Sequence, residues 1–274
     1  MKEKQFRKKH NWQLIIGCGL TGFFVLFTIV GQFWTPYDVT AMDAAARSAP
    51  PSLAHIMGTD NFGRDVFSRV MNGCGNTFLV AFCTVGIGAV FGTAIGALTG
   101  FYGGWIDEII MRINDAILSF PSILLALILI SLLGPGKLNI IIALGIIFIP
   151  SFARIVRGEV LRCKSLEYVQ SARVMGISNF RIIFAHILPN IWVSMLTAAM
   201  IGFNNAVLSE ASMSYLSLGV QPPEASLGRM LSEAQSLIFN APWYAIFPGI
   251  VIILIILGFS MISEGLRKLQ WGEN

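Results

Sequence analysis

Long apolar segments dominate this chain and limit the folds that it can adopt. Each is close to the roughly 20 residues that an α-helix needs to cross the hydrocarbon core of a bilayer. Polar, turn-rich stretches separate them. The pattern predicts six membrane-spanning helices, at about residues 12–34, 77–101, 113–133, 138–153, 188–208 and 243–262.

Composition is typical of a membrane protein rather than of a soluble domain. Only 12% of the residues are charged and 55% are hydrophobic, whereas a soluble domain carries roughly 25% charged residues. Much of the surface must therefore face lipid. The first apolar segment is too long for a signal peptide and no small-residue cleavage site follows it, so we expect a retained anchor. We expect an all-α polytopic membrane protein.

Lys and Arg are distributed unequally among the polar segments, which sets the expected orientation. With six spans and a cytoplasmic N-terminus, 14 of the 19 Lys and Arg residues lie on the cytoplasmic side, as the positive-inside rule requires. Both termini are then cytoplasmic. The predicted organisation is a basic N-terminus (1–11), a first span (12–34), an external segment (35–76), a five-helix core (77–263) containing a cytoplasmic loop (155–187), and a cytoplasmic tail (264–274).

A polar, basic stretch at residues 165–190 separates the fourth and fifth spans. Ser165 is a candidate N-cap, Gly176 can end a helix in the left-handed conformation, and Ser178 can begin the next helix. Pro189 marks the entry into the fifth apolar segment. The stretch therefore predicts a short helix across the cytoplasmic end of the bundle. One interpretation is a lever that docks on another protein, and the other is a solvated connector that only sets orientation.

Three features within or near the spans are candidates for a structural or functional role. Pro121 should bend the third span, because proline removes a backbone hydrogen bond and clashes with the preceding turn. Asp115 lies near the same span, either as a solvated or capping residue or as a proton relay. Small residues recur every four positions on one face of the second span and favour close helix packing, with a glycine-lined pore as the alternative: Gly88, Gly92, Gly96 and Gly100.

The external segment ends in a stretch where charges alternate in sign at helical spacing. These residues are Asp60, Arg64, Asp65 and Arg69. We expect exposed local ion pairs that orient a loop. A binding site for a charged solute is the alternative interpretation.

No pattern indicates catalysis, a bound nucleotide or a metal. The Gly-Lys pair that ends at Lys137 lacks the upstream glycine of a phosphate-binding loop, and the three histidines lie far apart. No basic stripe interleaves with aromatic residues, so a nucleic-acid partner is not expected. We expect no enzyme, no cofactor and no metal site. The spans also lack the charges that ion-driven carriers need, so a transporter of this kind must take its energy from a partner.

Several stretches together resemble the inner-membrane permease subunits of ABC importers. More narrowly, the chain is similar to the second ("C") permease of the dipeptide, oligopeptide and nickel uptake systems. The stretches are GTDNFGRDVFSR (58–69), FYGGWIDEIIMR (101–112), FPSILLAL (120–127), ARIVRGEVL (153–161) and LSLGVQPPEASLGRML (216–231).

The cytoplasmic loop resembles the general signature of these permeases, which is Glu-Ala-Ala, three residues, Gly, nine residues, Ile, one residue and Leu-Pro. Gly176 matches the glycine, and Leu188 and Pro189 match the end. Four other positions align with the signature but differ from it in three cases: Gln170, Ser171 and Ala172 at the Glu-Ala-Ala places, and His186 at the Ile place. Spacing and glycine are kept, so the helix geometry should be kept too.

The resemblance implies a machine with several subunits in the cell membrane of a bacterium. A second homologous permease would complete a heterodimeric pathway, two cytoplasmic ATPases would use ATP and each receive one coupling helix, and an external binding protein would deliver the solute. The residues implied in ATPase coupling are Glu167, Tyr168, Gln170, Ser171, Ala172, Arg173, Gly176, Leu188 and Pro189.

Two other classes of function remain open from the sequence. An ion- or proton-coupled carrier working alone would need charges inside the spans, and only Asp115 and Glu210 come close. A non-transporting scaffold would not need the long cytoplasmic loop or the bent span. The substrate stays open among dipeptides, oligopeptides, nickel and metal chelates, because selectivity in such systems lies largely in the binding protein.

Overall fold

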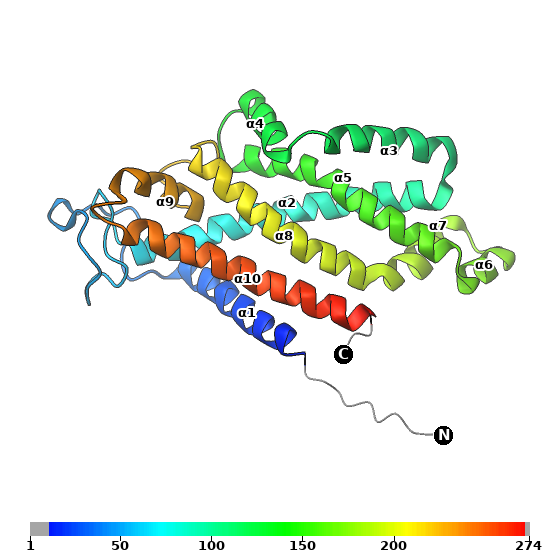
Figure 1. Ribbon diagram of the computed structural model, residues 1–274, viewed down its shortest axis with the longest axis horizontal. Helices are drawn as coiled ribbons and strands as arrows, with labels where there is room; N and C mark the ends of the chain where they lie inside the picture. The colour runs from blue at the N-terminus through cyan, green and yellow to red at the C-terminus, as the bar shows by residue number, and fades with distance from the viewer. Residues whose placement is uncertain (1–10, 272–274) are drawn as a thin grey trace, which may run out of the picture.

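The computed structural model describes residues 11–271, and these fold into an all-α bundle whose long helices run side by side (Figure 1). The predicted basic N-terminus, residues 1–11, lies almost wholly outside this range. The long helices are α1 (Trp12–Phe33), α2 (Val66–Tyr102), α5 (Lys137–Lys164), α8 (Trp192–Tyr215) and α10 (Trp243–Trp271).

Shorter elements occupy the edge and the two ends of the bundle. They are α3 (Gly104–Leu118), α4 (Ser122–Leu133), α6 (Glu167–Val174), α7 (Asn179–Arg181) and α9 (Leu227–Ala234), with 3₁₀ turns at Ala44–Ala46 and Gln235–Leu237. α6 and α7 lie at one end, and α9 lies at the other together with the long segment between α1 and α2 (Figure 1). We call these the α6 end and the α9 end.

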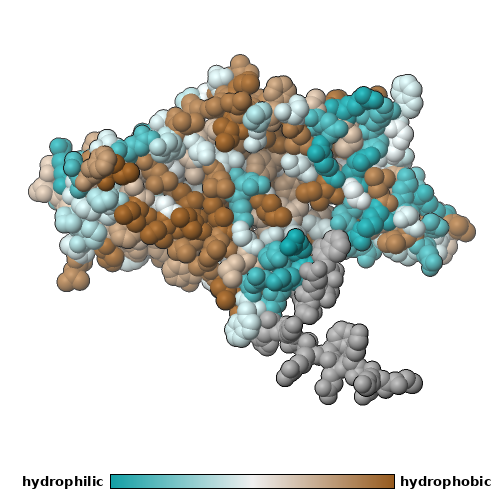
Figure 2. Space-filling view, in the orientation of Figure 1, coloured by the Kyte–Doolittle hydropathy of each residue, from teal (hydrophilic) through white to brown (hydrophobic). Residues whose placement is uncertain are grey.

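Five helical segments are long and apolar enough to cross a membrane, and the bent pair α3–α4 makes a sixth if it counts as one span. Many large apolar side chains on these helices are exposed, as lipid contact requires. Figure 2 shows hydrophobic residues over the central part of the bundle and hydrophilic residues gathered toward the α6 end. The prediction of an all-α protein with several spans is confirmed.

Several helices extend beyond the predicted spans, because hydropathy reports contact with lipid and not the extent of a helix. α2 begins at Val66, so the last part of the predicted external segment is helical. Asp65 caps this start, its carboxylate accepting from the Ser68 amide at 2.7 Å. α5 continues to Lys164, through the first part of the predicted loop at 155–187, and α10 continues through most of the predicted tail.

The third span also differs from its prediction. Residues 102–112, between the second and third predicted spans, are mostly helical, because α3 begins at Gly104 after a break at Gly103, whose φ is 69°. α3 and α4 then meet at 90° across the segment that contains Pro121. Asn114 on α3 donates to the Pro150 carbonyl of α5 at 2.9 Å, a bond that holds α3 against α5 on one side of the bend.

Four glycines bring α2 against α5 along one face. A Cβ on Gly92 would lie 2.5 Å from the Phe152 Cβ and 2.8 Å from the Ile149 carbonyl oxygen, too close for any side chain. The same holds along the face, where α2 meets the backbone or side chains of α5 at Gly88, Gly92, Gly96 and Gly100. We call these four residues the glycine seam. Their small size lets the two helices approach backbone to backbone.

A buried cluster of charged side chains links the separate segments that meet at the α9 end. Glu233 on α9 accepts from Arg64 Nη2 at 2.9 Å, from Arg69 Nη2 at 3.0 Å and from the Tyr244 hydroxyl at 2.6 Å. Asp60 accepts from Arg64 Nε at 2.6 Å. The expectation of exposed local ion pairs is wrong here, since Arg69 is only 1% exposed and the cluster reaches from the external segment to α2, α9 and α10.

The cluster also sets the charge state of Glu233. Burial raises the pKa of this carboxyl, but the positive charges of Arg69 and Arg64 and the hydrogen bonds from Tyr244 and Arg229 together outweigh burial, so the pKa lies below its ordinary value. A carboxyl with a lowered pKa stabilises the fold above its unfolded pKa and loses this contribution as the pH falls through the folded pKa. The α9 end should therefore weaken on strong acidification and not on alkalinisation.

We expect Gly92→Ala to destabilise the bundle by about 1–3 kcal/mol, because the added methyl group overpacks the seam. The matched control is Gly86→Ala on the same helix, where an added Cβ meets nothing within 4 Å. Thermal unfolding of the purified protein in detergent measures the difference. Equal unfolding temperatures for the two variants would show that the seam does not hold α2 to α5.

We expect Glu233→Ala to cost about 3–5 kcal/mol, because it removes one of the two carboxylates that Arg64 and Arg69 share and leaves only Asp60 to balance both buried charges. The control is Glu224→Ala, which removes a more exposed pair with Lys137 and should cost less than about 1 kcal/mol. Denaturant unfolding in detergent gives both values. Similar losses for the two variants would mean that burial of the cluster does not matter.

Candidate functional site

α6 has one face turned into the protein. Val169 and Ala172 are buried, and they belong to an apolar cluster that continues into the next segment of the chain and into the ends of α2 and α5. The other buried members of this cluster are Ala97, Phe101, Val156, Val160, Cys163, Ile182, Ile183, Ile187 and Ile191. Because interiors pack densely, a displacement of α6 must move its neighbours with it.

The N-cap of α6 differs from the predicted one, whereas the helix ends in the predicted glycine turn. Leu166 is the N-cap and offers no side-chain bond, whereas Ser165 donates to the Arg162 carbonyl at 2.9 Å. At the other end Gly176 has φ 75°, and the Ile177 amide bonds back to the Ala172 carbonyl at 3.1 Å. This is the glycine-ended pattern that closes a helix.

Two cations hold α6 and the end of α5 to the end of α2. The Arg173 guanidinium lies 4.8 Å from the centre of the Phe101 ring. Lys164 donates to the Phe101 carbonyl and lies 5.8 Å from the same ring. A cation over an aromatic face is attracted by about 0.5–1 kcal/mol at an exposed site. Phe101 is therefore a shared anchor for three elements.

The outward face of α6 and its C-terminal turn is open to solvent. Val174 is 89% exposed and Met175 is 71% exposed at the tip of the turn. Among the residues predicted to couple to the ATPase, those that share this outward position are Glu167, Tyr168, Gln170, Ser171 and Arg173. Ala172 does not share it, being 2% exposed, so its side chain faces the apolar cluster and not a partner. Sequence reasoning did not separate these two faces.

The chain between α6 and α8 changes helical type three times. After α7, residues Ile182–Ile187 form a π-helix and Leu188–Ile191 a 3₁₀ turn with Pro189 in its first positions. Asn190 donates to the His186 carbonyl at 2.6 Å and to the Tyr168 hydroxyl of α6 at 3.3 Å. Such stretches have weaker hydrogen-bond geometry and often mark a hinge. We call residues 182–191 the joint.

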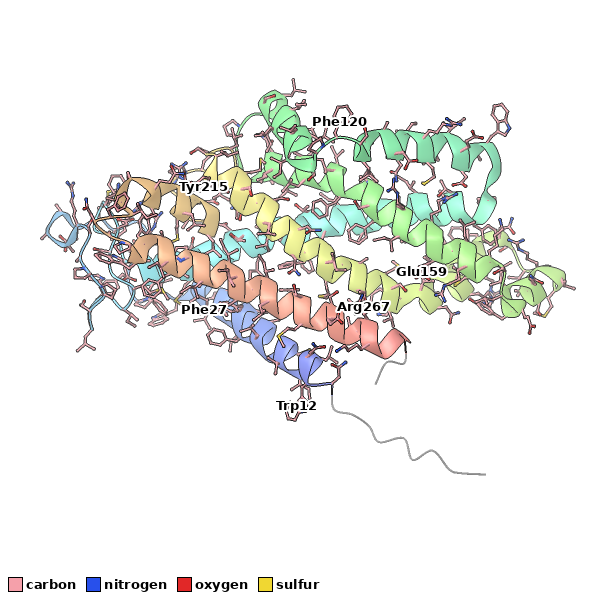
Figure 3. All side chains as sticks on the ribbon, viewed as in Figure 1. Trp12, Phe27, Phe120, Glu159, Tyr215 and Arg267 are labelled. Atoms are coloured by element: carbon pink, nitrogen blue, oxygen red, sulfur yellow. The ribbon has the colours of Figure 1, made fainter. Side chains whose placement is uncertain are left out.

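A cavity that is open on one side lies away from α6, midway along the bundle. Its volume is about 400 Å³, and it lies between the α3–α4 break, α5 and α8. In Figure 3, Phe120 marks the break, while Tyr215 and Glu159 mark the ends of α8 and α5 that lie toward α9 and α6. The sequence analysis did not find this cavity, although a polar residue such as Asn205 within an apolar helix was a usable signal. Among the described residues, no group of three or more His, Cys, Asp or Glu could hold a metal ion.

Comparison with known proteins identifies the family. The model of the family described as "Binding-protein-dependent transport system inner membrane component" matches residues 92–270. The chain belongs to this family. It is therefore a multi-pass inner-membrane permease subunit of an ABC importer, not itself catalytic, and the ATP is hydrolysed by a partner ATPase. An external binding protein is the other partner that this family requires.

Two curated relatives cover nearly the whole permease. The dipeptide transport system permease protein DppC of Alkalihalophilus pseudofirmus is 40% identical, over 96% of this chain and 86% of the relative. The glutathione transport system permease protein GsiD of Pectobacterium atrosepticum is 41% identical, over 90% and 83%. These matches confirm the expected resemblance to the peptide branch of ABC importer permeases.

A solved structure supports the fold of the permease core. The chain aligns with a chain of the MetNI methionine ABC transporter in an inward-facing conformation, with a TM-score of 0.60 and 21% identity. The alignment covers 72% of this chain and 94% of that chain. At this identity the likeness concerns the fold alone.

We expect Gly176→Val to reduce uptake driven by ATP, because a β-branched residue at φ 75° strains the turn by about 1–2 kcal/mol and loosens the end of α6. Gly176→Asn should keep most of the uptake, since Asn tolerates this conformation better. Gly158→Val on α5 is a second control, because a Cβ there meets nothing within 4 Å. Uptake per ATP hydrolysed, with subunit assembly checked, is the measurement. Normal coupling in Gly176→Val would contradict a role for this turn.

Proposed function

We propose that this permease is one of two homologous subunits that form the pathway of an ATP-driven importer for dipeptides or related small peptides such as glutathione. Two relatives at 40% and 41% identity carry these substrates in their names, so we favour peptides over nickel and metal chelates. The observation that carries the coupling part of the proposal is the two-sided α6, buried against the bundle on one face and open on the other.

In this proposal the α6 end faces the cytoplasm and the α9 end faces outward. The basic residues of the cytoplasmic loop lie toward α6 on α5, α6 and α7, and they support this orientation through the positive-inside rule. They are Arg154, Arg157, Arg162, Lys164, Arg173 and Arg181. α1 begins and α10 ends toward the same side of the bundle (Figure 1), so both termini would also be cytoplasmic.

α6 would be the coupling helix that docks on the ATPase. Its exposed tip, at Val174 and Met175, combines apolar surface with the polar residues of the same face, as a protein partner would need. A push on this tip passes through Val169 and Ala172 into the apolar cluster. The ends of α2 and α5 share that cluster, so the motion reaches the bundle without a nucleotide site in this chain.

The joint would let the lever move without breaking the fifth span. Leu188 and Pro189, which the signature includes, lie in its 3₁₀ turn and border an open apolar hollow with Trp192 and Met195. Proline cannot donate a backbone hydrogen bond, so the chain can bend at this turn at a lower cost. Leu188 and Pro189 would therefore set the angle between lever and span and would not contact the ATPase directly.

The subunit composition follows from the family design. Two cytoplasmic ATPases would bind beneath the permease pair, each receiving one coupling helix. The external binding protein would dock at the α9 end, and the second permease would face the cavity between α4, α5 and α8. Lipid would cover the exposed apolar residues of the remaining helices.

An ion- or proton-coupled carrier is the weaker candidate. Asp115 pairs with Arg154 at an exposed position, and Glu210 accepts hydrogen bonds from Thr77 at 2.9 Å and Ser214 at 2.6 Å. Both acids are therefore engaged in local structure. A member of this family also takes its energy from a partner ATPase, whereas an ion-coupled carrier must use its own charged residues to couple transport to an ion gradient.

We expect a cysteine at Val174 to crosslink to the ATPase in the assembled complex. The exposed native cysteine, Cys18, is first replaced by serine. The control is Leu53→Cys, an exposed position at the other end of the bundle, which should react with a membrane-impermeant maleimide only from outside. Labelling of Val174→Cys only from outside would overturn both the orientation and the partner, and labelling from inside without any crosslink would overturn the partner alone.

A further inference from the structure

The cavity at the α3–α4 break has a neutral polar lining. Fifteen residues from α3, α4, α5 and α8 surround its volume of about 400 Å³, and none of them is charged. Most are apolar. The polar ones are Ser122, Ser151, Asn205, Ser209 and Ser212.

Four of these polar side chains have no hydrogen-bond partner among the described residues: Ser122, Ser151, Asn205 and Ser209. Several other hydroxyls in the spans are satisfied by their own helix. Ser212 donates to the Leu208 carbonyl at 2.8 Å, Thr197 to Val193 at 2.9 Å and Ser131 to Ile128 at 2.7 Å. Buried polar atoms without a partner also occur elsewhere among the described residues, on Thr21, Thr28, Asn61, Arg69, Thr84, Thr93 and Asn204, whereas the four side chains at the cavity line one shared space.

The position of these groups makes their lack of partners costly. Asn205 lies near the middle of α8, Ser151 lies near the middle of α5, and Ser122 starts α4 at the break. All three fall within predicted membrane spans and are exposed on the surface of this single chain. A polar group without a hydrogen bond costs roughly 2–7 kcal/mol in an apolar medium, and lipid tails offer none. The partner must come from outside this chain.

The chemistry of the lining fits a peptide bond. A primary amide presents a donor and an acceptor side by side, and each hydroxyl can do either, so Asn205 and the serines can pair with both the N–H and the C=O of a peptide group. The lining has no charge with which to hold a terminal ammonium or carboxylate. A volume of about 400 Å³ is within the range of small-molecule sites, roughly 300–1,000 Å³.

We propose that Asn205, with Ser122, Ser151 and Ser209, forms a subsite on this half of the pathway that hydrogen-bonds the peptide groups of the passing solute. The inference rests on the proposed function, because it takes the solute to be a peptide. The subsite recognises the backbone peptide groups of the solute and not its side chains or charged ends. It therefore accepts peptides of differing sequence and discriminates against solutes that lack a peptide N–H.

The test uses the complete importer in vesicles, with ATP inside and a saturating amount of binding protein loaded with dialanine. Uptake per ATP hydrolysed is compared for the wild type, Asn205→Leu, Asn205→Gln and Ser209→Ala. Ser131→Ala is the matched control for Ser209→Ala, since its hydroxyl is already bonded within α4. The second probe is the ester analogue of dialanine, which lacks the peptide N–H. Co-purification of the second permease is measured for every variant.

Asn205→Leu should lower dialanine uptake per ATP by about five- to tenfold, which corresponds to the loss of about one hydrogen bond. Ser209→Ala should lower it less, Asn205→Gln should restore part of it, and Ser131→Ala should leave it unchanged. The wild type should carry the ester less well than dialanine, and Asn205→Leu should carry the two alike.

Two results would overturn the subsite. Asn205→Leu with unchanged dialanine uptake would show that the amide does not meet the solute. Loss of the second permease from Asn205→Leu, with assembly kept in Ser131→Ala, would assign the amide to a contact between the subunits. A wild-type complex that transports no peptide at all would refute the proposed function instead, so the two failures are distinguishable.

Discussion

The backbone contact between α2 and α5 is the constraint on which the rest of this permease depends. At the glycine seam the two helices approach so closely that even a methyl group on Gly92 has no room. Both functional regions attach to this pair. The apolar cluster behind α6 uses the ends of α2 and α5, and the central cavity is walled by the middle of α5. Because the seam prevents the two helices from separating, a push at α6 in the proposed coupling would move them together.

The two ends of the bundle differ in their hydrogen bonding and therefore in stiffness. At the α9 end, Glu233 receives donors from two arginines and a tyrosine on other elements, so the external segment, α2, α9 and α10 are bonded to one another. At the α6 end, the joint replaces regular α-helix by π and 3₁₀ turns. In the proposed orientation the bonded α9 end is external and the more compliant α6 end is cytoplasmic, which suits a subunit in which force enters on one side only.

The proposed route of the force and the proposed route of the solute meet on α5. Its C-terminal end packs against α6, and its middle, near Ser151, lines the cavity. The 90° bend between α3 and α4 places the start of α4 on the opposite wall of that cavity. A rotation of α5 with α2 would change the width of the cavity and the positions of its unpartnered hydroxyls. In this family the ATP is hydrolysed by a partner ATPase, which would supply the energy for such a change.

The sequence by itself determined that the chain is an all-α membrane protein with several spans. A run of about 20 apolar residues matches the thickness of the hydrocarbon core, and within lipid a helix satisfies all of its own backbone hydrogen bonds. It also predicted a glycine turn at Gly176 and a small-residue face on α2, since both depend on neighbours a few residues away. Only the tertiary structure decided that α2 begins at Val66, that Arg69 is buried beside Glu233, that Ala172 faces inward and that a cavity exists. Each of these depends on which distant segments meet, and hydropathy and local turn chemistry carry no information about such contacts.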